Sequence, residues 1–221
     1  MDEQPFIRID WIADNLDAIG LRLVEHLQMT VIAVVVGLVI SFALALIIRA
    51  VPRLYGPVIG ITGTMYSIPS LALFALLVPI TGLSLVTAEI ALVSYTLLIL
   101  VRNIVAGLEG VPAEVTEAAT AMGLSPSQRL LRVELPVALP VIVAGLRIAT
   151  VTTIGLVTIT TLIGAGGLGY LIVNSGINRF FPTSIYTGVV LAVALAIAAD
   201  VLLLWIQRVL TPWARAREAT G

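Results

Sequence analysis

Four long runs without a charged residue constrain this chain more than any other feature. They cover residues 27–48, 54–88, 148–178 and 180–199. A helix that crosses a membrane needs about 20 mostly apolar residues, so the two longer runs can each hold a span and a loop. Hydrophobic residues make up 59% of the 221 residues, and the mean hydropathy is +1.11. A soluble domain of this length cannot bury so much apolar surface, so we expect an all-α, polytopic membrane protein.

Five transmembrane helices account for these runs. We expect them at approximately 27–49, 57–79, 86–108, 137–163 and 184–208. A sixth span would have to be cut from the connection between the last two. A six-span topology would place the C-terminal arginines on the extracytoplasmic side, so we do not favour it.

The arginines predict the orientation, because cytoplasmic loops carry an excess of basic residues. With five spans, the arginines that share one side are Arg49, Arg53, Arg102, Arg129, Arg132, Arg147, Arg208, Arg215 and Arg217. The acidic segment 1–26 is then extracytoplasmic, and residues 209–221 form a cytoplasmic tail. Segment 1–26 also lacks the basic and apolar regions of a cleavable signal peptide.

The composition excludes most enzymatic chemistry within this chain. All twelve basic residues are arginine, there is no cysteine, and the single histidine is His26. A P-loop needs lysine to bind phosphate, so we expect no ATPase site here. Without cysteine there is no thiol nucleophile. We expect no bound cofactor, no metal site and no nucleic-acid partner, and we interpret His26 as an ordinary residue at the membrane surface.

The loop at about 109–136 is polar and lies between the third and fourth spans. Its sequence predicts two short helices with a bend at Gly123, a residue suited to ending a helix. Ser125 and the residues after it form a capping-box pattern with proline at the first helical position. We expect the second helix, about 126–134, to end before Pro136.

The first of these short helices is small and acidic. A helix that binds lipid is expected to be rich in lysine or arginine on its polar face, with bulky apolar residues opposite. Small side chains instead permit close approach by another protein. A protein partner is the favoured interpretation, and a membrane-surface helix pair without a partner stays open.

Within this loop the string "EAATAMG" (117–123) is followed, after nine residues, by "VELP" (133–136). This spacing resembles the EAA signature of the type I permeases of ABC importers. Val133 stands where isoleucine is usual. The matching residues are Glu117, Ala118, Ala119, Gly123, Leu135 and Pro136.

The resemblance covers about 27–208 and implies a five-span permease of the MetI-like fold, with its N-terminus outside and its C-terminus inside. It implies that the loop docks into a separate ABC ATPase subunit, which would hold ATP and magnesium. It further implies an extracytoplasmic substrate-binding protein and a second permease copy or paralogue. The expected location is a bacterial or archaeal cytoplasmic membrane, in contact with lipid.

Two other stretches resemble the branch of the family that imports osmoprotectants such as glycine betaine, choline and carnitine. They are "YSIPSLALFALLVPITGLS" (66–84) and "LIGAGGLGYLIVNSGINRFFPT" (162–183). The segment GAGGLG (164–169) also occurs in methionine-type permeases, so methionine or another amino acid is the alternative substrate. We interpret this segment as a bend between spans, with an outer gate as the alternative.

Pro69 interrupts the second predicted span. A proline removes one backbone donor and leaves the carbonyl four residues earlier, that of Met65, without its helical partner. Broken helices at membrane depth are tolerated where they line a cavity or are buried in protein. Tyr66, Ser67, Pro69 and Ser70 are therefore candidates for the translocation path, where Tyr66 would offer a π-face to a cation. A kink that serves packing alone is the alternative.

Two acids lie within predicted spans, and such residues are expected to face the protein interior. Glu89 lies near the outer end of its span, within reach of water, and Asp200 lies deeper. The candidate partners of Asp200 are hydroxyls of the fourth span, those of Thr150, Thr153, Thr158 and Thr161.

Either acid could instead attract a cationic substrate. A different class of function, a secondary transporter or channel, would use Glu89 or Asp200 for ion coupling. A membrane scaffold without transport activity is a third possibility.

Overall fold

The computed structural model describes residues 6–212, which form helices joined by turns and contain no β-strand. Four helical stretches are long and apolar enough to cross a membrane: α2 (Leu16–Ala50), α5 (Leu85–Glu109), Pro126–Val157 and α10 (Pro182–Leu210). Two shorter helices, α3 (Tyr55–Ser67) and α4 (Ser70–Thr81), meet at 97°. The described residues therefore contain four candidate spans, or five if this bent pair is one span.

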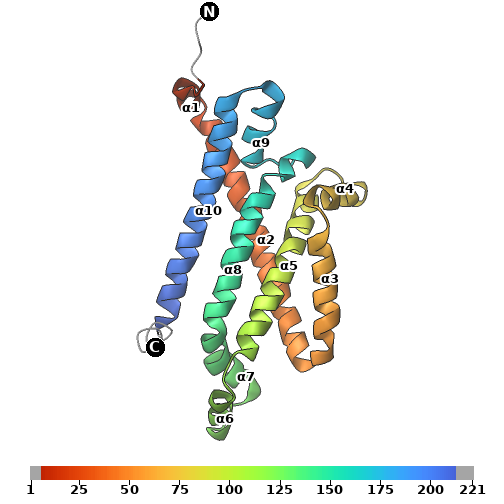
Figure 1. Cartoon of the computed structure of the whole chain (residues 1–221), viewed down its shortest axis with the longest axis vertical. Helices are drawn as coiled ribbons and strands as arrows, with labels where there is room; N and C mark the ends of the chain where they lie inside the picture. The colour runs from red at the N-terminus through yellow and green to blue at the C-terminus, as the bar shows by residue number, and fades with distance from the viewer. Residues whose placement is uncertain (1–5, 213–221) are drawn as a thin grey trace, which may run out of the picture.

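The long helices run side by side along the molecule (Figure 1). α5 packs against α2 and α8 (Leu135–Val157), and α10 packs against α8. α6 (Ala113–Ala121) and α7 (Pro126–Arg129) lie at one end, called here the α6 end. α1 (Ile9–Asp14), α4 and α9 (Gly169–Ile172) lie at the opposite end, called here the α9 end.

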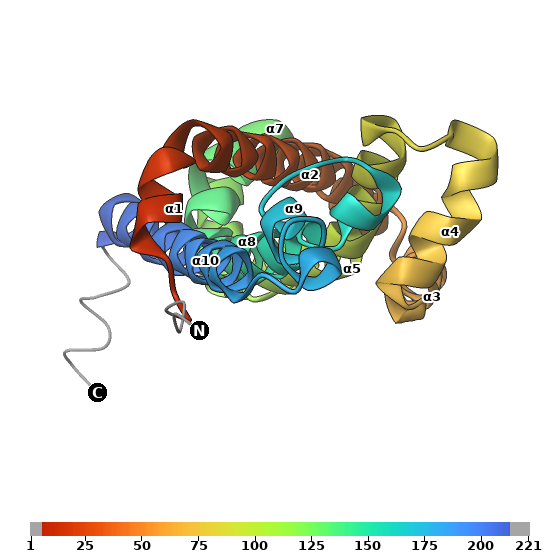
Figure 2. The same cartoon turned by 90° about the horizontal axis from the view of Figure 1, so that it is seen from above.

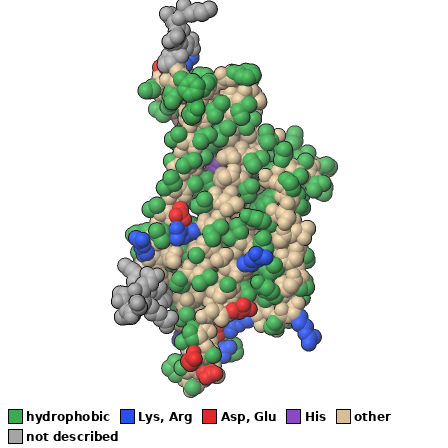
Figure 3. All heavy atoms as spheres, in the orientation of Figure 1, with side chains coloured by type: hydrophobic (Ala, Val, Ile, Leu, Met, Phe, Trp, Pro, Cys, Tyr) green, Lys and Arg blue, Asp and Glu red, His purple; other side chains and the backbone are tan. Residues whose placement is uncertain are grey.

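Viewed from the α9 end, α2 and α10 lie on either side of α8, and α3 and α4 extend away from them (Figure 2). Figure 3 shows hydrophobic side chains over most of one face, with charged side chains mainly in its lower half. This distribution is the one expected of a surface that contacts lipid.

The two larger of three apolar clusters form most of the core. One, around Phe74, Leu92 and Val157, joins α2, α4, α5 and α8 toward the α9 end. The other, around Leu100 and Ala138, joins α2, α5 and α8 toward the α6 end. Small residues let these helices approach closely, as is common where helices pack in lipid.

The predicted stop before Pro136 is wrong. α7 continues through a π-helical turn, Leu130–Glu134, directly into α8. Pro136 lies in the first turn of α8, just where the π turn changes the hydrogen-bond register, so its missing N–H interrupts no regular ladder. The far end of α8 also differs from the prediction, because the helix ends at Val157 and a 3₁₀ turn, Thr160–Ile163, follows.

α2 begins eleven residues before the predicted start of the first span. Its 35 residues correspond to about 50 Å, which exceeds the roughly 30 Å hydrocarbon core. The second half of segment 1–26 is thus helical and continuous with this span. Residues 213–221, most of the predicted tail, lie outside the described residues.

Candidate functional site

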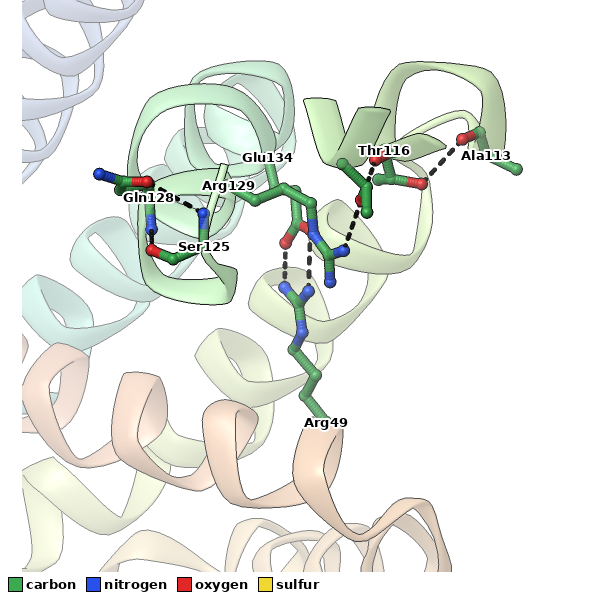
Figure 4. Close-up of polar contacts among 8 residues, drawn as sticks. Arg49, Ala113, Thr116, Ser125, Gln128, Arg129 and Glu134 are labelled. Atoms are coloured by element: carbon green, nitrogen blue, oxygen red, sulfur yellow. Dashed lines mark hydrogen bonds and ion pairs between the residues drawn. The ribbon is translucent and has the colours of Figure 1, made fainter. Parts of the chain in front are cut away.

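The loop at the α6 end has the local structure that its sequence predicts. Gly123 ends the first helix with φ of 81°, a left-handed conformation that glycine adopts readily. Ser125 then forms a complete capping box with Gln128. The Ser125 N–H donates to Gln128 Oε1 at 2.9 Å, and the Gln128 N–H donates to Ser125 Oγ at 3.4 Å (Figure 4).

The motif residues of this loop divide into two groups. Glu117, Ala118 and Gly123 are exposed, whereas Ala119 is 1% exposed and faces inward. α6 contacts α7 and the π turn. The loop therefore presents a small, acidic surface on a helix that is fixed from behind.

Leu135 and Pro136 lie apart from that surface. Both are half-buried in the first turn of α8, and Leu135 packs against the core cluster of the α6 end. The structure thus places the second part of the motif where the loop joins the bundle.

Glu134 is a buried acid that the sequence reasoning missed. It is 2% exposed and accepts hydrogen bonds from both Arg49 Nη atoms and from Arg129 Nε, the latter at 2.8 Å (Figure 4). Arg129 also donates from Nη1 to Thr120 Oγ1 at 3.0 Å. Side-chain contacts therefore connect α6, through Arg129 and Glu134, to the end of α2. The sequence signal that could have indicated this ion pair is an acidic residue that closely follows an arginine in a half-apolar stretch.

The candidate path residues surround the break between α3 and α4. Tyr66 is 38% exposed, Ser67 and Pro69 are exposed, and Ser70 is half-buried. The Tyr66 ring meets the Tyr95 ring edge-on, with 5.9 Å between centroids. One exposed aromatic ring, that of Tyr66, thus lies beside an interrupted helix, backed by the buried Tyr95.

The break at Pro69 is sharper than a proline kink, and it satisfies its backbone differently from the prediction. The Met65 carbonyl is not left free, because it accepts the Ile68 N–H at 3.3 Å in a tightened last turn. The Ile68 carbonyl instead accepts the Tyr95 hydroxyl. Tyr95 thereby holds the break to α5.

The predicted threonine partners of Asp200 are wrong. Asp200 pairs with Arg147 of α8, whose Nε and Nη2 donate to the two carboxylate oxygens at 2.8 and 2.9 Å. Thr150, Thr153 and Thr158 donate to carbonyls of α8, and Thr161 donates to Asn174. The orientation analysis counts Arg147 with the cytoplasmic arginines, but it lies in the fourth turn of α8, and its side chain reaches Asp200.

Glu89 lies in the second turn of α5. Glu89 as a whole is half-buried, but both of its carboxyl oxygens are buried and have no hydrogen-bond partner among residues 6–212. The prediction that water reaches this carboxyl at the end of the helix does not fit its burial. The structure does not bring Glu89 and Asp200 together by any contact.

The GAGGLG segment is held against the first half of α2. Glu25 accepts the Gly167 N–H at 2.9 Å, and the Arg22 guanidinium lies 3.9 Å from the centroid of the Tyr170 ring. His26, expected at the membrane surface, is fully buried. It accepts the Leu168 N–H at 3.2 Å through Nδ1, so Nε2 carries the proton and donates to the Ile154 carbonyl at 3.0 Å.

Comparison with known proteins places this architecture in one family. The sequence pattern of "Binding-protein-dependent transport system inner membrane component" matches residues 33–216. The choline transport system permease protein OpuBB of Bacillus subtilis is 36% identical over 85% of this chain and 86% of its own length. The osmoprotectant import permease protein OsmW of Salmonella typhimurium is 37% identical over 92% and 97%. The carnitine transport permease protein OpuCD of Listeria monocytogenes is 38% identical over 92% of both.

Solved structures show the same fold. A chain of the inward-facing MetNI methionine ABC transporter superposes with a TM-score of 0.78 at 28% identity, over 87% of this chain and 96% of that one. A chain of an amino acid ABC transporter superposes with a TM-score of 0.74 at 16% identity, over 91% and 98%, which shows the fold alone. The chain is thus an all-helical permease of MetI-like fold, and it belongs to the family of binding-protein-dependent transport system inner membrane components.

Proposed function

We propose that this chain is the permease subunit of an ATP-driven importer for osmoprotectant quaternary amines, a class that includes choline, carnitine and glycine betaine. The observation that carries the proposal is the set of relatives named above. Three of them, each above 35% identity and spanning at least 85% of this chain, are permeases for choline, osmoprotectants or carnitine.

The exposed surface of α6 is the proposed docking site for a separate ATPase subunit, which would bind ATP and magnesium. Glu117, Ala118 and Gly123 would contact that subunit directly, and Ala119 would support them from the buried side. Closure of the ATPase subunits would move α6. The contacts from Thr120 through Arg129 and Glu134 to Arg49 would pass that movement to α2 and α8.

The proposed orientation places the α6 end in the cytoplasm of a bacterium or archaeon and the α9 end outside. An extracytoplasmic binding protein would deliver the substrate at the α9 end. A second permease, identical or paralogous, would complete the path, because four or five spans enclose little space alone.

The break between α3 and α4 is the proposed segment of the path that meets the substrate. A quaternary ammonium is attracted to aromatic faces by the ring quadrupole, and Tyr66 lies half-exposed there beside Tyr95. The hydroxyls of Ser67 and Ser70 lie at the two ends of the break. Tyr66→Ala is expected to slow choline uptake about tenfold and Tyr66→Phe less than threefold, because only the first removes the π-face.

Uptake by proteoliposomes that contain the permease, its ATPase and its binding protein tests the function. Labelled choline, carnitine, glycine betaine and methionine are offered separately with ATP inside the vesicles. Accumulation of a quaternary amine, abolished without ATP, is the expected result. ATP-independent uptake driven by an ion gradient would instead support the secondary-transporter class.

Methionine or another amino acid is the second candidate substrate. The likeness to the methionine transporter at 28% identity and TM-score 0.78 favours it. Methionine accumulation that excess choline leaves unchanged would establish this alternative.

A further inference from the structure

The turn between α9 and α10 holds an aromatic side chain outward on a strained backbone. Phe180 has φ of 50° and ψ of 42°, and among residues 6–212 it is the one non-glycine residue with positive φ. Its side chain is 92% exposed. An aromatic residue has no intrinsic preference for either property, so the surrounding structure imposes both.

Backbone hydrogen bonds fix this turn from within. The Asn178 N–H donates to the Val173 carbonyl at 2.9 Å, and the Phe181 N–H donates to the Gly176 carbonyl at 3.0 Å. A methyl group at Gly176 would overlap the Ile172 carbonyl oxygen, so the chain approaches itself closely there. The turn is thus a compact, self-supported structure.

Contacts with the N-terminal helices fix the turn from both sides. Trp11 of α1 meets Phe181 edge-on with 5.0 Å between ring centroids, and the Arg8 N–H donates to Thr183 Oγ1 at 3.0 Å. On the preceding side, Glu25 and His26 of α2 hold the GAGGLG segment. Phe180 is therefore displayed on a base that α1 and α2 anchor.

The neighbours of Phe180 resemble the centre of a protein interface. Ile177 is 54% exposed, and Asn178 and Arg179 are exposed beside it. Exposed aromatic and arginine side chains on a rigid base commonly carry most of the binding energy in protein–protein contacts. Strained residues also concentrate at binding sites.

We infer that the turn 177–180 is a docking anchor for the extracytoplasmic binding protein. Phe180 would enter an apolar pocket on that protein, and acidic side chains at the pocket rim would face Arg179. The inference rests on the proposed function, which places the α9 end outside. The family is defined by dependence on a binding protein, and this turn lies at the end opposite α6.

Substitutions that keep the backbone separate docking from folding. Asparagine tolerates the left-handed conformation, so Phe180→Asn removes the ring and retains the turn. Phe180→Trp retains an aromatic anchor. Leu83, 71% exposed in the turn between α4 and α5, supplies the matched control Leu83→Asn.

The first readout is uptake by the reconstituted transporter as the concentration of its binding protein is varied. Phe180→Asn is expected to raise the half-saturating concentration about tenfold or more, with the maximal rate and the basal ATPase activity unchanged. Phe180→Trp and Leu83→Asn should stay within about threefold of the parent. Equal half-saturation in Phe180→Asn and the parent would overturn the inference while the proposed function stands.

The second readout is photo-crosslinking from position 180 in intact cells, with benzoylphenylalanine in place of phenylalanine. An adduct whose partner mass spectrometry identifies as the solute-binding protein supports the inference. Adducts with phospholipid alone would show that the turn contacts the membrane and would overturn it. A parent transporter without any uptake in the first assay would overturn the proposed function and the inference together.

Discussion

Arg49 and Glu134 lie 85 residues apart in the chain and form an ion pair that joins the end of α2 to the turn before α8. Arg49 Nη2 donates to Glu134 Oε1 at 2.8 Å, and Glu134 is almost fully buried while Arg49 is partly exposed. Arg129 binds the same carboxylate. One acid therefore sets the position of the α6 loop relative to two long helices.

Replacing Glu134 by glutamine should destabilise this end of the bundle. The change leaves two arginines without their carboxylate, and solvent reaches both of them, so the expected loss is about 1–3 kcal/mol rather than the full cost of an isolated buried charge. For a chain of this size the thermal midpoint should fall by roughly 2–4 °C per kcal/mol. Thermal unfolding of the purified permease in detergent measures it.

The matched comparison is the double replacement Arg49→Met with Glu134→Met. Removing Arg49 together with Glu134 is expected to cost less than removing Glu134 alone, because only Arg129, which solvent reaches, is then left without its carboxylate. Equal destabilisation in the single and double variants would contradict an energetic role for the pair.

Gly123→Ala should disturb the α6 loop through its backbone alone. A methyl group there meets nothing within 4 Å, but φ is 81°. The left-handed conformation costs an L-residue about 1–2 kcal/mol, so ATPase activity coupled to transport should fall severalfold. Gly20→Ala, whose added methyl also meets nothing within 4 Å, should leave coupling unchanged. Equal effects in the two variants would contradict this account of Gly123.

Two glycines of α8 should differ in how their replacement by alanine affects the thermal midpoint. A methyl at Gly145 would overlap the Asn103 side chain of α5, whereas a methyl at Gly155 meets nothing within 4 Å. Overpacking typically costs about 1–3 kcal/mol, so Gly145→Ala should lower the thermal midpoint and Gly155→Ala should not. A lower midpoint for Gly155→Ala alone would disprove this helix packing.

The Arg147–Asp200 pair should show charge compensation. Both residues lie inside long apolar helices, where an unpaired charge costs about 2.5–3.5 kcal/mol on insertion scales. Asp200→Asn should therefore reduce the amount of folded permease in membranes, and adding Arg147→Gln should restore much of it. Fluorescence-detected gel filtration of membrane extracts measures both. A double variant no better than Asp200→Asn would show that the pair does not matter for insertion.

Local features of the fold were predictable because they depend on neighbours in sequence. The end of α6 at Gly123, the capping box at Ser125 and the break at Pro69 follow from glycine, serine and proline chemistry within a few residues. The all-helical membrane fold follows from the uncharged runs, and the EAA spacing identified the family. These expectations are confirmed.

The contacts that position the site were not predictable, because they join residues distant in sequence. Counting arginines for topology treats each as a loop marker, which hid the pairing of Arg147 with Asp200. His26 carries no local signal for the two backbone groups that it binds on other segments. The continuation through Pro136 depends on a π turn, which local propensity does not anticipate.

Co-purification of an ATPase subunit with the tagged permease tests the central claim most directly. The proposed docking surface predicts that an ABC ATPase elutes with the parent chain and that Glu117→Arg abolishes this, because the substitution places a long cation on the exposed face of α6. The Glu117→Arg chain should retain the parent's thermal midpoint. A well-folded parent that retains no ABC ATPase, or a Glu117→Arg variant that retains it fully, would contradict the proposal that α6 is the docking site for the ATPase.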